Sequence, residues 1–581
     1  MSVTGKGVAI LCAAIVLAGC GGGDGSGGSA PPVNRPPQLA LPNTEQPAVE
    51  LHAFSYDVSQ GGRTFTDPDG DTLRYDIELG HLGNPYSDPD PPHGLRIEGT
   101  RVVGAPEETG VAVVTVTVSD AQGQTETNQF NIRVAPNGKP QVVNSPADLL
   151  VNTGAALNVD ASFAGATFSD PDGDPLTYSI QMRGAPGVSA NGVQLSGTLN
   201  SVGLVEVTVT ARDAYGGSGD DVFLIAAPAA APGSPSLPAT SYTYESRTPD
   251  MPYVYRQPAI FFDTERADNP TTNSGATLGR VLFHDQRLSI TNTIACASCH
   301  SQSHGFASAE RFNVGALGIP LQRHAMALVN TRYNFNGAWF SDMRVRSLQD
   351  VAHQAMSSPE EMAMSTQLLE SKLRATAFYE QLFEAAFGTP EITEARVLSA
   401  LEQYLQSLVA YRTKFDRAFN SMDNEAVDPG LVLDPQEMRG LDIFRGAAGI
   451  ACNRCHQLQS GVNVWQANNG LDDVLKDTGT HDPALQRDGS QGVFRAGALR
   501  NIAVSAPYMH DGRFATLREV IDHYDHDIKD TPDLDPLLRT FDRAPWRMNL
   551  SEADKDALEA FLRTLTDEEM LADPKFSDPF L

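Results

Sequence analysis

The sequence predicts a multidomain protein in which two all-β sandwich modules precede a mainly α-helical module with two lobes. The length of 581 residues corresponds to about three or four domains of roughly 150 residues each. An internal repeat with strand-type alternation fills the N-terminal part, whereas the C-terminal half shows helix-type spacing and two short cysteine–histidine motifs. Hydrophobic residues make up 41% of the chain and charged residues 20%, so most of it can bury a core.

The chain is strongly acidic. It carries 42 Lys and Arg against 72 Asp and Glu, which gives a formal net charge of −30 at pH 7. A surface of this sign repels the phosphates of nucleic acids and of anionic lipids. We therefore expect no nucleic-acid partner and no membrane contact through basic residues.

Residues 1–19 have the organisation of a signal peptide. Lys6 precedes a short apolar run that cannot span a bilayer, which takes about 20 apolar residues. The ending Leu17–Cys20 resembles a bacterial lipobox, which implies cleavage before Cys20 and lipidation of its sulfur. Residues 20–34 then form a Gly/Ser-rich tether. This interpretation predicts a lipid-anchored protein of the cell envelope, at the outer membrane and facing the periplasm or the cell surface. The alternative is an ordinary secretory signal with an incidental cysteine.

The next part of the chain contains a repeat. The segment Phe65–Asp71 returns as Phe168–Asp174. A run in which β-branched residues alternate with other residues follows each copy, a pattern typical of half-buried strands. We predict two β-sandwiches, over residues 35–136 and 137–228, each of the size of an immunoglobulin-like unit. The pattern resembles bacterial cadherin-like and immunoglobulin-like modules.

The repeated segments carry aspartates at alternate positions. Their carboxylates could offer oxygen ligands to Ca²⁺, as such aspartates can in the modules they resemble. The alternative is plain turn chemistry, because Pro-Asp-Gly favours turns and the spacing is not that of an EF-hand. The candidate calcium ligands are Asp67, Asp69, Asp71, Asp170, Asp172 and Asp174.

A Pro- and Ala-rich linker, residues 229–245, is expected to act as a semi-rigid spacer before the helical module. In that module Thr389-Pro390 matches a helix N-cap followed by a first-turn proline, and leucines follow at helical spacing. Near the C-terminus Ser551 begins a capping-box pattern. We predict the two lobes over residues 246–420 and 421–581.

Each predicted lobe contains one Cys-x-x-Cys-His motif. Two cysteines at this spacing can form thioethers to both vinyl groups of one haem, and the adjacent histidine then lies beneath the iron as its proximal ligand. A zinc ribbon would need four ligands per site and would leave the histidine unexplained, and a thioredoxin-type motif would need a βαβ context. We therefore predict two covalently bound haem c groups, one in each lobe. The attachment residues are Cys296, Cys299, His300, Cys452, Cys455 and His456.

Further motifs accompany the haem sites between about residues 270 and 570. In order they are Leu278–Phe283, Arg323–Asn330, Ser358–Met362, Leu499–Ile502 and Ala506–Gly512. With them the sequence resembles the bacterial di-haem cytochrome c peroxidase family, including its MauG-like branch. The resemblance implies an oxidoreductase in which the first haem reacts with hydrogen peroxide. The second haem would receive electrons from a small periplasmic donor, such as a c-type cytochrome or a cupredoxin.

The resemblance also implies roles for single residues. Glu361 matches the catalytic glutamate, which would move a proton between the oxygens of peroxide; the alternative is a helix-surface carboxylate. Two positions depart from the family pattern. Ser341 stands where the family has a tryptophan between the haems, with Trp339 as a candidate substitute. Val351 stands where a glutamine usually precedes the glutamate by ten positions.

On the far side of the second haem, the position where many members place a methionine holds Tyr524, as in the MauG-like branch. His523 is the competing ligand, and a tyrosine that only packs is the third alternative. For the first haem, His304 and His324 are available as distal histidines; His304 has the character of a surface residue.

The family also has a calcium site between the haems. Asn330, with backbone oxygens near Ser505 and Pro507, matches it, although ordinary loops offer the same oxygens.

The predicted function is reduction of hydrogen peroxide to water. The alternatives are a MauG-like oxidase of a protein or an organic substrate, a non-catalytic di-haem electron carrier, and a surface adhesin with a vestigial haem module. An open haem that reacts with peroxide distinguishes an enzyme from a carrier.

Overall fold

The computed structural model describes residues 33–80, 93–244, 263–334, 337–419, 428–458, 466–480 and 491–581. The chain forms two compact units. The first comprises Met1–Lys139, Pro171–Asp174 and Ala214–Gly217, and the second comprises Pro140–Asp170, Pro175–Asp213 and Ser218–Leu581. The predicted signal peptide and Cys20 lie outside the described residues. Within the described ranges, no helix combines the length and the apolar character that crossing a membrane requires.

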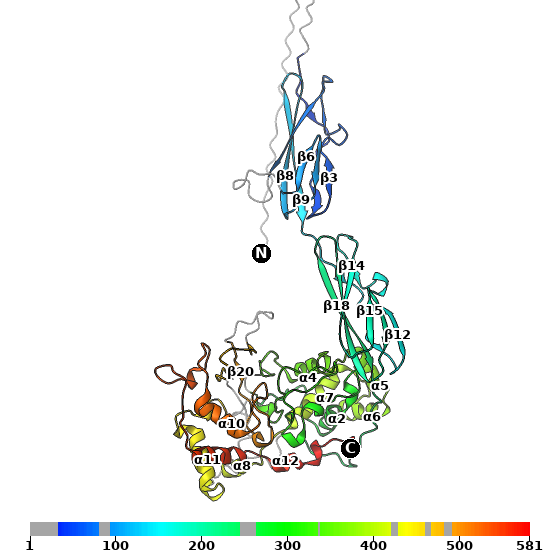
Figure 1. Ribbon diagram of the computed structural model, residues 1–581. Coiled ribbons are helices and arrows are strands. Elements are labelled where there is room, and N and C mark those ends of the chain that lie inside the picture. The colour runs from blue at the N-terminus through cyan, green and yellow to red at the C-terminus, as the bar shows by residue number, and fades with distance from the viewer. Residues whose placement is uncertain are drawn as a thin grey trace, which may run out of the picture. The chain divides into compact units, whose positions relative to one another are not determined.

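The first β-sandwich lies in the first unit (Figure 1). Its strands are β1 Gln38–Leu39, β2 Gln46–Val49, β3 Phe54–Asp57, β4 Phe65–Thr66, β5 Arg74–Gly80, β6 Leu95–Glu98, β7 Arg101–Gly104, β8 Gly110–Ser119 and β9 Thr125–Ala135. One sheet has the order β2-β9-β8-β5 and another the order β3-β7-β6. Val114, Val116 and Val118 of β8 are fully buried, because alternate side chains of a strand point to one face. The predicted strand pattern is confirmed.

The second β-sandwich repeats this topology. Its strands are β10 Gln141–Val142, β11 Leu149–Leu150, β12 Ala156–Asp160, β13 Phe168–Ser169, β14 Thr177–Gly184, β15 Val188–Asn191, β16 Gln194–Thr198, β17 Gly203–Arg212 and β18 Ser218–Ala227. The sheets have the orders β11-β18-β17-β14 and β12-β16-β15. As in the first sandwich, a short edge strand pairs in parallel with the last strand, and the other pairs of that sheet are antiparallel.

One end of the second sandwich is buried against the helical module, within the second unit. Val205 of β17 and Ile225 of β18 lie in the core of the sandwich. Their chain neighbours Leu204 and Leu224 belong to a separate apolar cluster that they share with residues of the helical module, among them Leu317. Because successive side chains alternate between faces, both faces of these two strands are buried here.

The linker is packed along the helical module in its described part. The N–H of Ala229 donates to the carbonyl oxygen of Thr291 over 2.8 Å. Tyr244 is 2% exposed and belongs to the core of the first lobe. The segment that its composition marks as a spacer is thus part of a folded unit.

The helices of the first lobe are α2 Asn273–His284, α3 Cys296–Cys299, α4 Leu348–Ser357, α5 Thr366–Arg374, α6 Ala377–Phe387 and α7 Glu394–Ser407. Helices α2 and α7 cross closely: a Cβ atom at Gly279 would lie 2.0 Å from the carbonyl oxygen of Ala400, so only glycine permits this contact. The apolar faces of these helices form the largest core of the chain's described part.

The second lobe contains α8 Lys414–Phe419, α9 Pro435–Asp442, α10 Leu517–Asp522, α11 Glu552–Arg563 and the short strands β19 Gln466–Ala467 and β20 Phe494–Arg495. Helix α11 packs against α9, where a Cβ at Gly440 would lie 1.9 Å from the oxygen of Ala557. The chain then returns to the first lobe through α12 Glu568–Ala572, whose Met570 lies in the first-lobe core.

The two predicted helix starts had different outcomes. Ser551 is the N-cap of α11 and accepts the N–H of Asp554 over 3.2 Å, as predicted. Helix α7, however, starts at Glu394 with Thr393 as its N-cap, so the start predicted at Thr389-Pro390 is wrong. The guanidinium of Arg396 donates to the hydroxyl of Thr389 over 2.8 Å, which holds the preceding residues outside the helix.

Candidate active site

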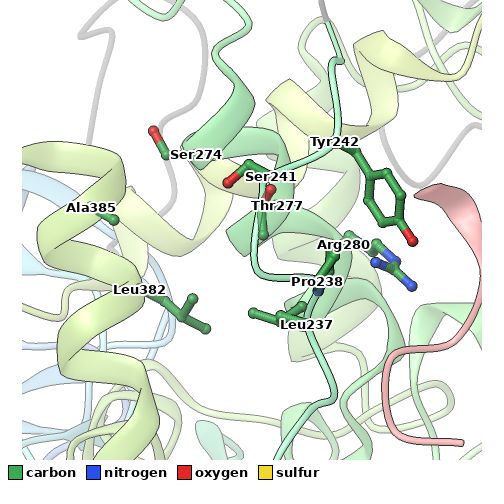
Figure 2. A pocket seen from close by; sticks show the side chains of 9 residues that line it. All are labelled: Leu237, Pro238, Ser241, Tyr242, Ser274, Thr277, Arg280, Leu382 and Ala385. Carbon is green, nitrogen blue, oxygen red and sulfur yellow. The ribbon is translucent and has the colours of Figure 1, made fainter.

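A small pocket lies where the linker crosses α2 and α6, with Leu237 and Leu382 facing each other across it (Figure 2). It is lined by Leu237, Pro238, Ser241, Tyr242, Ser274, Thr277, Arg280, Leu382 and Ala385. None of these residues belongs to a Cys-x-x-Cys-His motif or to the segment around Glu361. This pocket is therefore separate from the predicted haem sites and from Glu361.

The first motif forms one helical turn, α3, followed by His300. Nδ1 of His300 lies 3.0 Å from the carbonyl oxygen of Phe306, and because a carbonyl can only accept, Nδ1 carries the proton. This leaves Nε2 as the nitrogen that can bind a metal, in the arrangement usual for metal-ligating histidines. Burial lowers the pKa of His300 to about 4, so the ring is neutral, as metal binding requires.

The second motif repeats this arrangement. Residues Cys452–Arg454 form a 3-10 turn, and Nδ1 of His456 lies 3.0 Å from the carbonyl oxygen of Gly497. Burial also lowers the pKa of His456. Both motif histidines are therefore neutral and offer Nε2.

The motif cysteines form no disulfide bond. Burial raises the pKa of Cys296 and Cys452 to about 12 and that of Cys299 and Cys455 to about 11. A zinc site would need four ligands, and among the described residues no group of three or more neighbouring metal-ligand side chains includes these cysteines. The donor set fits thioether attachment of haem, in which sulfur bonds to carbon and the histidine binds the iron.

Glu361 lies in the turn that follows α4. Its N–H donates to the carbonyl oxygen of Ser358 over 3.0 Å. Burial raises the pKa of Glu361 to about 7, against the opposing effect of Arg344 and with a further upward contribution from Glu360. The charge of Glu361 in turn raises the pKa of Cys299, so the carboxylate lies near the first motif. A carboxyl group that titrates near neutral pH can both accept and return a proton.

Arg344 is the cation that approaches Glu361. Its Nη1 lies 2.9 Å from Oδ2 of Asp342, and its Nε donates to the side-chain oxygen of Gln354 over 3.4 Å. Gln354 lies one turn after Val351 on the same face of α4. A glutamine thus contacts the charged group beside Glu361, three residues later than the family pattern places it.

The two lobes meet at the segment around Ser341, whose carbonyl oxygen accepts the N–H of Arg495 over 2.8 Å. Within the described part of the chain, the guanidinium of Arg495 reaches two weak acceptors, the oxygen of Ala338 at 3.3 Å and Sδ of Met326 at 3.4 Å. Its Nε has no partner among the described residues, and burial lowers the pKa of Arg495 to about 10. Arg495 is half-buried, and a haem propionate would supply a counter-charge that its partners among the described residues do not. Trp339 lies nearby in the chain, buried in the first-lobe core.

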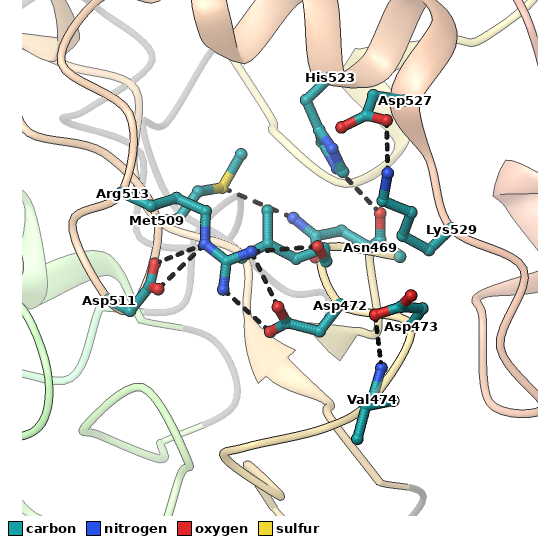
Figure 3. Close-up of polar contacts among 12 residues, drawn as sticks. Asn469, Asp472, Asp473, Val474, Met509, Asp511, Arg513, His523, Asp527 and Lys529 are labelled. Atoms are coloured by element: carbon teal, nitrogen blue, oxygen red, sulfur yellow. Dashed lines mark hydrogen bonds and ion pairs between the residues drawn. The ribbon is translucent and has the colours of Figure 1, made fainter.

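Tyr524 lies beside the second motif, since it packs in one apolar cluster with Cys452. The side-chain amide of Asn469 donates to the hydroxyl oxygen of Tyr524 over 3.4 Å and to Sδ of Met509 over 3.6 Å. Nε2 of His523 lies 3.1 Å from the backbone oxygen of the same Asn469 (Figure 3). This contact engages only Nε2 of His523 and leaves Nδ1, so Tyr524 and His523 both stay predictions for the iron ligand.

The candidate distal histidines of the first haem differ in their surroundings. His324 lies near His300, whose pKa its charge lowers, and its Nδ1 is 3.0 Å from the carbonyl oxygen of Glu310. His304 lies in a 3-10 turn, with Nδ1 3.1 Å from the hydroxyl of Ser303.

Asn330, the side chain predicted to bind calcium between the haems, forms a hydrogen bond with the backbone. Oδ1 of Asn330 accepts the N–H of Ala410 over 2.7 Å, although a carbonyl oxygen keeps a second lone pair. The hydroxyl of Ser505 donates to Ile502 over 3.2 Å, and Pro507 follows a cis peptide bond.

The repeat aspartates take part in turns. Oδ1 of Asp67 accepts the N–H groups of Asp69 and Asp71, which is the plain-turn alternative. In the first unit, two clusters of three side chains each nevertheless have their ligand atoms close enough together to bind one metal ion. They are Asp67, Asp71 and Asp120, and His52, Asp172 and Asp174. Asp69 pairs with Arg35 over 2.7 Å.

Sequence reasoning missed Arg495, Gln354 and Asn469. The helical spacing from Val351 was a signal for Gln354. Arg495 and Asn469 act through contacts with distant parts of the chain, for which the sequence carries no local signal.

Comparisons with known proteins agree with this geometry. Residues 273–424 match the family model described as di-haem cytochrome c peroxidase, and residues 36–135 match that of a putative Ig domain. The methylamine utilization protein MauG of Methylorubrum extorquens is 31% identical over 315 residues, which cover 52% of this chain and 80% of that protein. The cytochrome c551 peroxidase of Nitrosomonas europaea is 28% identical over 322 residues, covering 54% and 86%.

Among solved structures, a MauG-like protein associated with microbial copper homeostasis is 29% identical. The match covers 57% of this chain and 99% of that one, with a TM-score of 0.49. The match to MauG of Methylorubrum extorquens covers 80% of that protein, and the other relatives are named as MauG proteins or cytochrome c peroxidases. The chain belongs to the di-haem cytochrome c peroxidase and MauG family, an oxidoreductase family that implies two c-type haems.

Proposed function

We propose that the protein reduces hydrogen peroxide to water with electrons from a small periplasmic donor, a c-type cytochrome or a cupredoxin. The observation that carries the proposal is the half-buried carboxyl group of Glu361, with a pKa of about 7, beside the first haem motif. Relatives named cytochrome c551 peroxidase support this class of reaction.

The chain's own residues would manage the protons of this reaction. One peroxide takes up two electrons and two protons and gives two waters. Haem held by His300 would supply the electrons that break the O–O bond. Glu361 in its ionised form takes a proton from one oxygen of peroxide and returns it to the other, so that the second oxygen leaves as water. Arg344 stabilises the ionised form of Glu361, which is present before the first transfer and again after the second.

The electron donor would dock on an acidic protein. The formal net charge of −30 favours a donor with a basic surface and a fast, salt-sensitive encounter. Turnover that rises as salt is lowered would support such a donor.

A second candidate function, oxidation of a protein or an organic substrate as in MauG, is favoured by Tyr524. We propose that its phenol oxygen, which lies beside Asn469 and near Cys452, is the distal ligand of the second haem. A methionine in that place raises the potential of a haem, whereas a phenolate, a hard anion, stabilises oxidised iron. A second haem of low potential is suited to oxidising chemistry rather than to storing an electron.

The test is a steady-state peroxidase assay of the haem-loaded protein with several reduced donors. Glu361→Gln should abolish most turnover while both haems stay attached. Glu384→Gln, at an exposed position of α6, is the matched control and should behave as the wild type. Failure of every donor, together with peroxide-driven oxidation of an organic substrate, would favour the MauG-like reaction. Failure of peroxide to react at all would leave an electron carrier.

We further propose that Cys20 carries lipid and anchors the protein in the cell envelope, at the outer membrane. Cys20→Ala should release the protein from the membrane fraction, and a variant that stays bound would refute the lipobox.

Calcium between the lobes, held by Asn330 and by backbone oxygens near Ser505 and Pro507, is another part of the proposal. A chelator should lower turnover, and added Ca²⁺ should restore it.

A further inference from the structure

The second β-sandwich contacts the segment that carries Glu361. Nη1 of Arg183 on β14 lies 2.9 Å from Oε1 of Glu360, and its Nη2 lies 3.0 Å from Oε2 of Glu206 on β17. Arg183 and Glu206 are paired across the two strands, so the register of the sheet fixes the direction of the guanidinium. One arginine thus joins a rigid sheet to the residue immediately before Glu361.

An apolar contact accompanies this ion pair. Ala363, two residues after Glu361, is 1% exposed and has a left-handed backbone with φ +54°, which is unfavourable for alanine and persists only where surrounding packing holds it. Its side chain lies in the cluster that the sandwich shares with the helical module. The members of this cluster are Leu204, Leu224, Ala226, Ile290, Ala316, Leu317 and Ala363.

A loop around residue 316 fills the space between the sheet and the Glu361 turn. The N–H of Ala316 donates to the carbonyl oxygen of Glu361 over 2.7 Å. On the other side of the loop, a Cβ at Gly184 of β14 would lie 3.2 Å from the side chain of Leu317. The backbone of Glu361 is therefore held by a loop whose far side rests on the sandwich.

We propose that the second β-sandwich is a positioning element of the active site, with Arg183 as the positioning residue that holds the Glu361 turn in place beside the first haem motif. The inference rests on the proposed role of Glu361 in proton transfer. It gives the sandwich a function in the reaction in addition to its place between the anchor and the enzyme.

The charges around Glu361 predict the direction in which the pH profile of each variant should shift. Glu360 and Arg344 act on Glu361 from its own turn and from the segment after Ser341, and the cysteines of the first motif become neutral thioethers once haem is attached. The positive charge of Arg183 is shared with Glu360. Its removal should strengthen the negative charge beside Glu361 and move the acid limb of the pH profile to higher pH. Loss of Glu360 should move that limb to lower pH.

The first measurement is hydrogen exchange in the full-length, haem-loaded protein. Arg183→Gln and Glu360→Gln should each speed exchange in peptides spanning residues 311–321 and 358–364, and Arg183→Lys should restore most of the protection. The control is Arg133→Gln, which removes an exposed ion pair with Glu45 in the first sandwich (2.9 Å) and should leave both peptides unchanged. Unchanged exchange in both test variants overturns the inference, whether or not the wild type consumes peroxide.

The second measurement is the pH dependence of kcat/KM for peroxide in the same proteins. Arg183→Gln should lose about tenfold or more, since a misplacement of about 1 Å can cost roughly 10²-fold. Its acid limb should shift in the direction opposite to that of Glu360→Gln. Faster exchange with an unchanged pH profile and unchanged kcat/KM would make Arg183 a structural contact only and would overturn the inference. A wild type that is inactive with every donor refutes the proposed function, and exchange then decides whether Arg183 holds the turn.

Discussion

Replacement of Glu361 by glutamine tests the proposed reaction and its electrostatics together. The amide has almost the same shape but cannot take up and return a proton, and a positioned general acid–base group typically contributes about 10²–10⁴-fold. We expect kcat to fall by that factor while both haems stay attached. In the wild type, only ionised Glu361 can accept the proton of peroxide. With a pKa of about 7, kcat/KM should therefore fall roughly tenfold for each pH unit below 7.

The same substitution should affect stability in the opposite sense. The pKa of Glu361 is about 7 in the folded protein and about 4.3 in an unfolded chain. Between these values the folded state binds more protons, so its stability falls as pH rises from about 4 to 7 and stays reduced above that. The loss is at most about 4 kcal/mol, and less where solvent screens the charge. Glutamine avoids this loss, so Glu361→Gln should be more stable than the wild type at about pH 8 and equal to it near pH 4.

The assays are steady-state turnover between about pH 5 and 8 and thermal unfolding of the holoprotein over the same range. A structural carboxylate would show the reverse, with unchanged turnover and a destabilised variant. Unchanged turnover of Glu361→Gln, or a wild-type profile that is flat across pH 7, would refute the reasoning.

Three further predictions concern the haem sites. Mass spectrometry of the denatured protein should show the mass of two attached haems. Replacing Cys296 and Cys299 together by alanine should remove one haem, and replacing Cys452 and Cys455 together should remove the other. A wild type with one haem would contradict the assignment. Tyr524→Phe should change the ferric spectrum of one haem and His523→Gln should not, whereas the opposite result would identify the histidine as ligand. Arg495→Gln should lower the midpoint potential of a haem, because a nearby cation favours the reduced and less positive state, and Arg495→Lys should keep it; potentials that are equal in all three proteins would argue against a counter-charge to haem.

The features that the sequence predicts well are local ones. Five consecutive residues define each haem motif, and the structure orients both motif histidines as that chemistry requires. Ser551 caps its helix because the cap depends only on residues within one turn. Thr389 satisfies the same kind of local pattern and is not a cap, since its hydroxyl binds Arg396. Ser551 and Thr389 both match the local pattern of a helix N-cap. Tertiary contacts, which the neighbouring sequence does not show, determine which of the two caps a helix.

Positions that tune the site depend on contacts between distant segments. Arg183 and Glu360 are 177 residues apart in the chain, and Arg495 meets Ala338 across 157 residues. The outward apolar residues Leu204 and Leu224 interrupt the alternation expected of a half-buried strand, and continuous apolar runs favour strands buried on both faces. That pattern indicates that a second face of the strand is buried. It does not indicate which part of the chain covers that face, which is the helical module.

The family relationship bears on the local motifs and not on the contacts between distant segments. The first haem motif and Glu361 lie within residues 273–424, the region that matches the family model, and the family implies two c-type haems. Arg183 and Arg495 lie outside residues 273–424, the region that matches the family model, yet one contacts the residue beside Glu361 and the other lies at the junction of the two lobes. The potential of a haem and the proton affinity of a carboxyl group both respond to nearby charges. We therefore expect the choice between peroxide reduction and MauG-like oxidation in this protein to depend also on residues that the family motifs do not contain.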